Sequence, residues 1–85
     1  MTPEEIRNAY LEELVTVAPD IDPLTVRDSD HLQDDLELDS MDVLNFVTAL
    51  HDRLGVNIPE ADYPLIATPA LAVDYLSEMI ALKKG

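Results

Sequence analysis

One serine, Ser40, occupies the most chemically suggestive position in this sequence. It stands between Asp39 and Met41-Asp42, immediately before an apolar stripe that predicts a helix. If Asp39 caps that helix, the Ser40 hydroxyl projects at the positive end of the helix dipole, where an attached phosphate would be stabilised. A serine in front of an apolar stripe is, however, a common helix cap itself. These residues alone leave both interpretations open.

The remaining residue types argue against an enzyme. The chain has no cysteine, so it has no thiol nucleophile, thiolate metal site or disulfide of its own. Gly55 is the only glycine before the last residue, which excludes a nucleophile elbow and a glycine-rich phosphate loop. His51 shares a polar side of its expected helix with Thr48 and Asp52, as a surface histidine does, and His31 lies in an acidic segment. We therefore expect no catalytic residue.

The acidic segment matches a calcium-binding loop only in part. Asp28 and Asp30 fit the first two ligand positions of an EF-hand. Leu32 then stands where an oxygen ligand is needed, Gln33 replaces the turn glycine, and Asp39 replaces the bidentate glutamate. We expect no metal site.

Charge and length narrow the class of protein further. The 85 residues include 18 acidic and 5 basic side chains, for a net charge of −13. Nucleic acid and anionic membranes would repel this surface, whereas a basic patch on a partner would attract it. No apolar run approaches the roughly 20 residues of a membrane span, and the start of the chain is acidic where a secretion signal is basic. We expect one domain, residues 1–85, in a cytoplasmic monomer.

The elements that position Ser40 are predicted to be helical. Capping residues and apolar periodicity indicate helices from Thr2-Pro3 to about Val17, from Asp39 to Gly55 and from Thr68-Pro69 onwards. A short element over residues 60–63, closed by Pro64, precedes the last of these. The fold class is thus all-α: three principal helices and a short fourth helix in a small bundle, with a long loop between helices 1 and 2.

Apolar residues mark the expected core. The long loop, residues 18–39, carries aliphatic side chains that predict a segment pinned to the core: Ile21, Leu24, Val26, Leu32, Leu36 and Leu38. The second helix has the stripe Val43, Phe46, Val47, Leu50 and Leu54. The last helix has the apolar face Leu71, Ala72, Tyr75, Leu76, Met79 and Ile80.

Several motifs, in order, resemble those of acyl carrier proteins. Asp39-Ser40-Met41-Asp42 resembles the family's Asp-Ser-Leu/Met-Asp motif, and the run from Leu32 to Leu36 resembles its aliphatic-acidic approach. Downstream, residues 50–59 are similar to the end of the family's second helix with its Ile-Pro turn, and residues 68–76 are similar to its last helix. The likeness covers essentially the whole chain.

The resemblance implies a carrier that is modified after synthesis. In the family, a phosphopantetheinyl transferase moves 4′-phosphopantetheine from coenzyme A to the motif serine, here Ser40. The thiol of the arm then carries an acyl group as a thioester to fatty-acid, specialised lipid or polyketide biosynthesis enzymes, which meet the acidic carrier with basic patches. The likeness further implies that Asp39 and Asp42 engage the transferase, and that Met41 and Leu44 face partners or the root of the arm, or lie at the edge of the core.

Two departures from the family pattern bear on the cargo. Glu37 stands where the family usually has glycine, which is expected to alter the local backbone. The exposed face of the second helix has few acids where fatty-acid carriers are rich in glutamate, which favours a specialised pathway. An aminoacyl or polyketide carrier and an unmodified acidic interaction module remain as alternatives, and a small hydrolase using Ser40 is disfavoured because no base or oxyanion glycine accompanies it.

Overall fold

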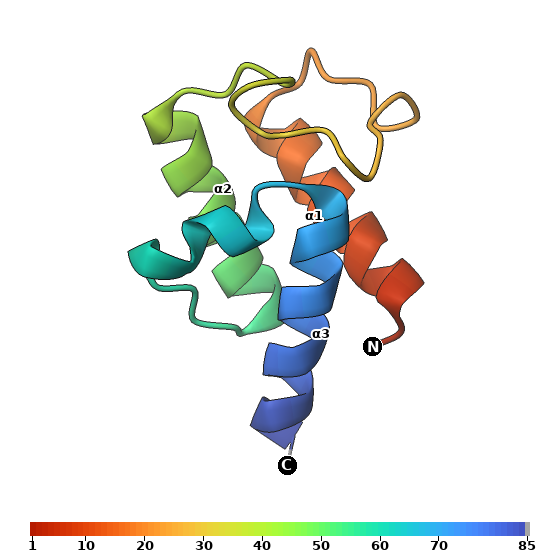
Figure 1. The fold of residues 1–85 in the computed structure, drawn as a ribbon, viewed down its shortest axis with the longest axis vertical. Coiled ribbons are helices and arrows are strands. Elements are labelled where there is room, and N and C mark those ends of the chain that lie inside the picture. The colour runs from red at the N-terminus through yellow and green to blue at the C-terminus, as the bar shows by residue number, and fades with distance from the viewer. Residues whose placement is uncertain (85) are drawn as a thin grey trace.

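The computed structural model describes residues 1–84, which form the expected all-α bundle (Figure 1). Its elements are the α-helices α1 (Pro3–Val17), α2 (Ser40–Leu54) and α3 (Pro69–Lys84), with the 3₁₀-helix η1 (Glu60–Ile66) between α2 and α3. α1 runs towards the long loop, which spans one end of the bundle, and α2 and α3 run back from that end (Figure 1). α2 therefore begins at the loop end of the molecule.

Local capping explains where the helices begin and end. The Thr2 hydroxyl accepts from the Glu5 N–H at 3.2 Å, and the Thr2 N–H donates to the Glu5 carboxylate at 2.8 Å, which forms the predicted capping box of α1. Gly55 ends α2 with φ 67°, a left-handed conformation that glycine adopts without a steric penalty. The Thr68 hydroxyl accepts from the Leu71 N–H at 3.2 Å and so caps α3.

The short fourth helix is longer than predicted. It was expected to close at Pro64, yet it continues through this proline to Ile66. The Asp62 N–H donates to the Pro59 carbonyl at 2.9 Å, and the Ala67 N–H donates to the Pro64 carbonyl at 3.4 Å. Pro64 starts the second of these turns, where its fixed φ fits and its own missing N–H is not needed. Because η1 consists of separate 3₁₀ turns, it can continue through Pro64.

The core forms where the three α-helices meet. The rings of Tyr10 and Phe46 pack edge to face at 4.8 Å between centroids, and both side chains are fully buried. Such side chains each contribute roughly 1.5–3 kcal/mol on burial. The other large side chains in this fully buried group are Ile6, Leu14, Leu50, Ile66, Leu76 and Pro69.

Two predicted core residues lie at the surface. Leu24 is 93% exposed because the turn from Asp22, whose carboxylate accepts from the Leu24 N–H at 3.0 Å, directs the side chain outwards. Leu71 is 46% exposed because the stripe through Ala72 and Leu76 faces the core, and Leu71 is rotated about 100° from it. The predicted stripe of α2 fits better: Phe46, Val47 and Leu50 are buried, and Val43 and Leu54 pack partly buried against the core.

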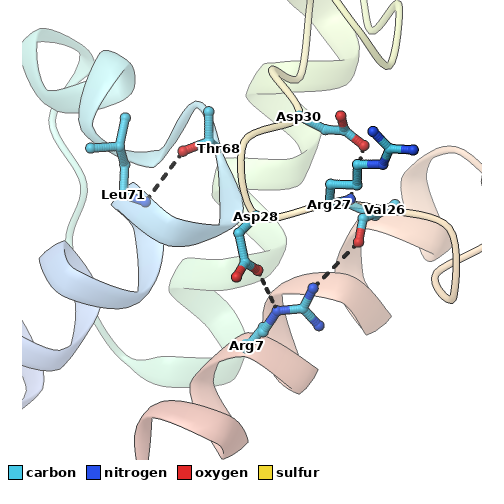
Figure 2. A network of polar contacts seen from close by, with 7 residues as sticks. All are labelled: Arg7, Val26, Arg27, Asp28, Asp30, Thr68 and Leu71. Carbon is cyan, nitrogen blue, oxygen red and sulfur yellow. Dashed lines mark hydrogen bonds and ion pairs between the residues drawn. The ribbon is translucent and has the colours of Figure 1, made fainter.

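The long loop is pinned to the bundle, as its aliphatic residues predicted. Val26, Leu32 and Leu38 are all buried. Arg7 of α1 donates to the Asp28 carboxylate at 2.8 Å and to the Val26 carbonyl at 3.3 Å, and these contacts tie the middle of the loop to α1 (Figure 2). The Leu32 N–H donates to the Ala67 carbonyl at 2.9 Å, which ties the loop to the segment after η1. The loop thus holds the start of α2 in a fixed place.

Candidate functional site

The start of α2 separates the roles of its two polar residues. Asp39 is the N-cap, because its carboxylate accepts from the Asp42 N–H at 2.8 Å and its carbonyl accepts from the Val43 N–H at 3.0 Å. Ser40 is the first helical residue and is exposed. Within residues 1–84, no hydrogen bond of the Ser40 hydroxyl is found. Asp39 therefore caps α2, and the Ser40 hydroxyl is available at its positive end.

The backbone just before Ser40 is unusual. Glu37 has φ 61°, a left-handed conformation that costs a residue with a Cβ roughly 1–2 kcal/mol. The next residue, Leu38, is buried and its N–H donates to the Leu32 carbonyl at 2.9 Å. The burial of Leu38 thus holds Glu37 in a conformation that glycine would adopt without strain. The sequence led us to expect an altered backbone at Glu37, whereas this residue adopts a conformation that suits glycine.

A pocket adjoins Ser40. Its volume of about 450 Å³ is within the range of roughly 300–1,000 Å³ typical of small-molecule sites. α2 contributes Met41 and Leu44 beside the serine, and the facing side comes from the loop and η1. The loop and η1 side is lined by His31, Leu32, Gln33, Glu60, Tyr63 and Pro64. The pocket offers mostly apolar walls next to one hydroxyl at a helix N-terminus.

The four other predicted site residues surround Ser40. Asp39 is exposed, and Asp42 is half-buried in the first turn of the helix. Met41 is 63% exposed and Leu44 is 46% exposed, although both are large apolar side chains. Their exposure favours a role towards partners or the arm over a role at the core edge.

His31 was not predicted as a site residue, yet it lines the same pocket. Its Nδ1 accepts from the backbone N–H groups of Gln33 at 3.1 Å and Asp34 at 3.2 Å. An Nδ1 that accepts carries no proton, so the neutral ring is protonated on Nε2. His31 therefore has no basic nitrogen free to activate Ser40, which argues against a hydrolase. No local sequence pattern marks His31 as a pocket residue, because only the folded loop brings it there.

Arg53, the one arginine of α2, is paired with two carboxylates of α1. Arg53 donates to Glu12 and to Glu13 of α1, at 3.0 Å each, and these hydrogen bonds, with the Glu13 bond first, raise the pKa of Arg53 above its ordinary value. The His51 Nδ1 contacts the Val56 carbonyl at 3.0 Å, which requires an N–H on that nitrogen. The acids that α2 itself contributes are Asp42 and Asp52, so this face is polar and has few acids of its own.

Two tyrosines hold η1 against the bundle beside this pocket. Tyr10 donates to the Ile66 carbonyl at 2.9 Å, and burial raises the pKa of Tyr10. Tyr75 of α3 donates to the Asp62 carboxylate at 2.8 Å, and burial together with this contact raises the pKa of Tyr75 to about 12. The wall of the pocket formed by η1 is thus fixed by hydrogen bonds to α1 and α3.

The site suits a phosphate-linked group held through the serine oxygen. The N–H groups of Ser40 and Met41 lie in the first turn of α2, where no carbonyl of the helix can pair with them. A phosphate on the serine would lie near those donors and the helix dipole, and an attached chain could lie against the apolar walls of the pocket. In the described part of the chain, no group of three or more His, Cys, Asp or Glu residues could hold a metal ion. No helix among residues 1–84 is long and apolar enough to cross a membrane.

Comparisons with known proteins agree with this chemistry. Residues 9–76, which include Ser40, match the protein family described as "Phosphopantetheine attachment site". The solved structure of the acyl carrier protein from Enterococcus faecalis, reported for structural components that contribute to its high thermal stability, is similar to this chain. The TM-score is 0.72 with 33% sequence identity, and the match covers 93% of this chain and 99% of that chain.

Proposed function

Because this chain belongs to the acyl carrier protein family, whose members hold covalently attached phosphopantetheine, we propose that Ser40 carries the arm. A member of this family is a carrier and not a catalyst. The thiol at the end of the arm supplies the group that forms a thioester with the cargo. The chain itself provides the hydroxyl, the helix start that holds it and the surface that partners meet.

The observation that carries this proposal is the division of roles at the start of α2. Asp39 satisfies the helix cap, and Ser40 remains exposed beside the apolar pocket. The transfer forms a phosphate ester on the Ser40 oxygen and breaks the pyrophosphate bond of coenzyme A. The serine loses its proton, and the nucleotide leaves with one phosphate from that bond. A hydroxyl engaged in capping would be a poorer acceptor for this step.

The proposed cargo is an acyl group. The similarity to an acyl carrier protein over nearly the whole length of both chains supports it. An aminoacyl carrier and an unmodified acidic module are the alternatives. We propose that residues 1–85 form a single carrier domain that works as a monomer in the cytoplasm.

The proposed partners are a phosphopantetheinyl transferase and biosynthetic enzymes with basic patches. Asp39 and Asp42 offer carboxylates close to Ser40, and Met41 and Leu44 offer exposed apolar contacts beside it. Charge attraction speeds such encounters and weakens with salt, whereas the apolar contacts are less sensitive.

We further propose a specialised pathway over housekeeping fatty-acid synthesis. The outer face of α2 supports this, because the helix itself contributes only two acids, Asp42 and Asp52. Housekeeping fatty-acid enzymes should therefore load and elongate this carrier slowly compared with their own carrier. Normal rates in that assay would exclude the specialised pathway.

Attachment is tested by intact mass. The full chain is incubated with coenzyme A and a promiscuous transferase, alongside Ser40→Ala and the matched control Ser29→Ala, which removes another exposed serine. We expect one added phosphopantetheine mass in the wild type and in Ser29→Ala and none in Ser40→Ala. No addition to the wild type, under conditions that modify a known carrier, would favour the interaction module.

A further inference from the structure

His31 is held rigidly at the pocket that contains Ser40. Its Nδ1 accepts from two backbone N–H groups, at 3.1 and 3.2 Å, and the backbone N–H of His31 donates to the Asp35 carboxylate at 2.7 Å. The His31 carbonyl also accepts from the Asp35 and Leu36 N–H groups, at 2.9 and 3.0 Å. The imidazole therefore acts as the cap of a turn, and its orientation is set by the backbone.

This capping determines the tautomer of the His31 ring. Because Nδ1 is an acceptor in both hydrogen bonds, the neutral ring has its proton on Nε2. The side chain is 36% exposed, so the part of the ring not used in the cap is open to a ligand. The ring therefore has one N–H donor, on Nε2. In metal sites, a hydrogen bond to one ring nitrogen fixes the tautomer of a ligating histidine in the same way.

The carboxylates around the pocket would repel a phosphate on Ser40, and an N–H donor would offset that repulsion. The pocket lining includes one carboxylate, Glu60 of η1, together with His31 and the Tyr63 hydroxyl. Asp34, Asp35 and Asp39 lie on the adjoining loop, and the chain has a net charge of −13. A phosphodiester on Ser40 would add a further negative charge here. Donors that contact it directly offset the repulsion, and hydrogen bonds to an ionised acceptor are about twice as strong as neutral ones.

We propose that the Nε2–H of His31 donates a hydrogen bond to the phosphodiester of the arm on Ser40, and so positions the root of the arm against the pocket. This inference rests on the proposed attachment at Ser40. It assigns to the loop a binding residue that acts together with the N–H groups at the start of α2. His31 and Ser40 line the same pocket from opposite elements, so the contact bridges the loop and the helix.

The two contacts to Nδ1 leave Nε2 as the ring nitrogen that can donate. The charged groups around the ring are Asp34, whose carboxylate lies 3.9 Å from Nδ1, Asp35, which accepts from the His31 backbone N–H, and Glu60, which lines the pocket from η1.

The test compares apo and arm-loaded full-length protein by NMR of the histidine rings. His51 is the internal control, because its Nδ1 is a donor to the Val56 carbonyl and it lies outside the pocket. We expect the Nε2 and ring-proton resonances of His31 to shift when the arm is attached, with the Nε2–H tautomer in both states. The His51 resonances should not move.

Two variants of His31 test the proposed hydrogen bond to the phosphodiester separately from the capping of the turn. His31→Ser and His31→Asn keep a side chain that caps turns well but lose the imidazole donor, and His51→Asn is the matched control. In the loaded protein, the phosphorus resonance should shift in both His31 variants relative to the wild type and should not shift in His51→Asn. Using both replacements keeps the test valid if one of them fails to fold.

The outcomes are distinguishable. If mass spectrometry shows the arm on Ser40 while the phosphorus resonance and the His31 signals do not respond, the contact is refuted and the carrier function stands. If no arm attaches to the wild type, the proposed function and this inference both fail.

Discussion

Replacing the strained Glu37 by glycine should stabilise the fold. Glu37 has φ 61°, and the left-handed conformation costs a residue with a Cβ about 1–2 kcal/mol. Glycine removes that cost but adds about 0.4–1 kcal/mol of unfolded-state entropy. The net expectation for Glu37→Gly is a gain of about 0–1.6 kcal/mol in the free energy of unfolding, centred near about 0.8 kcal/mol. For a chain of this size the central value corresponds to roughly 3–6 °C in Tm.

Charge must be separated from backbone strain in this experiment. Glu37 lies among acids, so removal of its carboxylate alone relieves repulsion. Glu37→Gln and Glu37→Ala remove the charge and keep a Cβ. Urea unfolding and calorimetry of all four proteins, at low and high salt, isolate the backbone part as the difference between the glycine and alanine variants. If Glu37→Gly is no more stable than Glu37→Ala, the strain argument is wrong.

Three other predictions concern the contacts that frame the site. Tyr10→Phe leaves the buried Ile66 carbonyl without its donor and should lower the free energy of unfolding by about 1–3 kcal/mol in urea titrations; an unchanged value would show that the hydrogen bond is dispensable. Asp39→Ala should cost about 1 kcal/mol by loss of the cap on the Asp42 N–H, whereas Asp39→Asn, which still caps, should cost little; equal losses would contradict the capping role. Tyr75 has its pKa raised to about 12 from 10.0, so the unfolded chain loses this proton first, and stability should fall as pH rises from about 10 through 12, which unfolding measured over that range would check.

The start of α1, the end of α2 and the start of α3 were predictable because they depend on neighbouring residues. Thr2 with Glu5 forms a capping box, Gly55 suits the left-handed end of α2, and Thr68-Pro69 opens α3. Each of these signals acts within one turn of helix. Local sequence carries them completely.

Features that depend on distant packing could not be predicted in this way. Leu24 and Leu71 have the apolar character of core residues, but their exposure is set by a turn and by the rotation of α3. Likewise, the pocket at Ser40 exists because η1 is held against the bundle, and His31 belongs to it only through the folded loop. No local sequence pattern predicts the pocket or the place of His31 in it.

The choice between Asp39 and Ser40 as the cap shows how distant contacts decide a local question. Aspartate and serine cap helices about equally well, so sequence alone leaves the register open by one residue. Leu38 resolves it, because its side chain is buried and its N–H binds the Leu32 carbonyl. That contact fixes Asp39 as the first residue free to cap. The strain at Glu37 is the accompanying cost, and an exposed hydroxyl at Ser40 is the result.

The distribution of charge extends this argument to partners. α2 contributes only Asp42 and Asp52 as acids to its outer face, whereas the loop before Ser40 carries several exposed carboxylates. At physiological salt, attraction between exposed charges acts over a screening length of about 8 Å. On the proposed function, a basic partner is therefore drawn to the loop end of the molecule, which is where α2 begins (Figure 1). The acids that guide the encounter and the hydroxyl that carries the arm thus lie at the same end, so added salt should slow association more than it weakens apolar contacts at Met41 and Leu44.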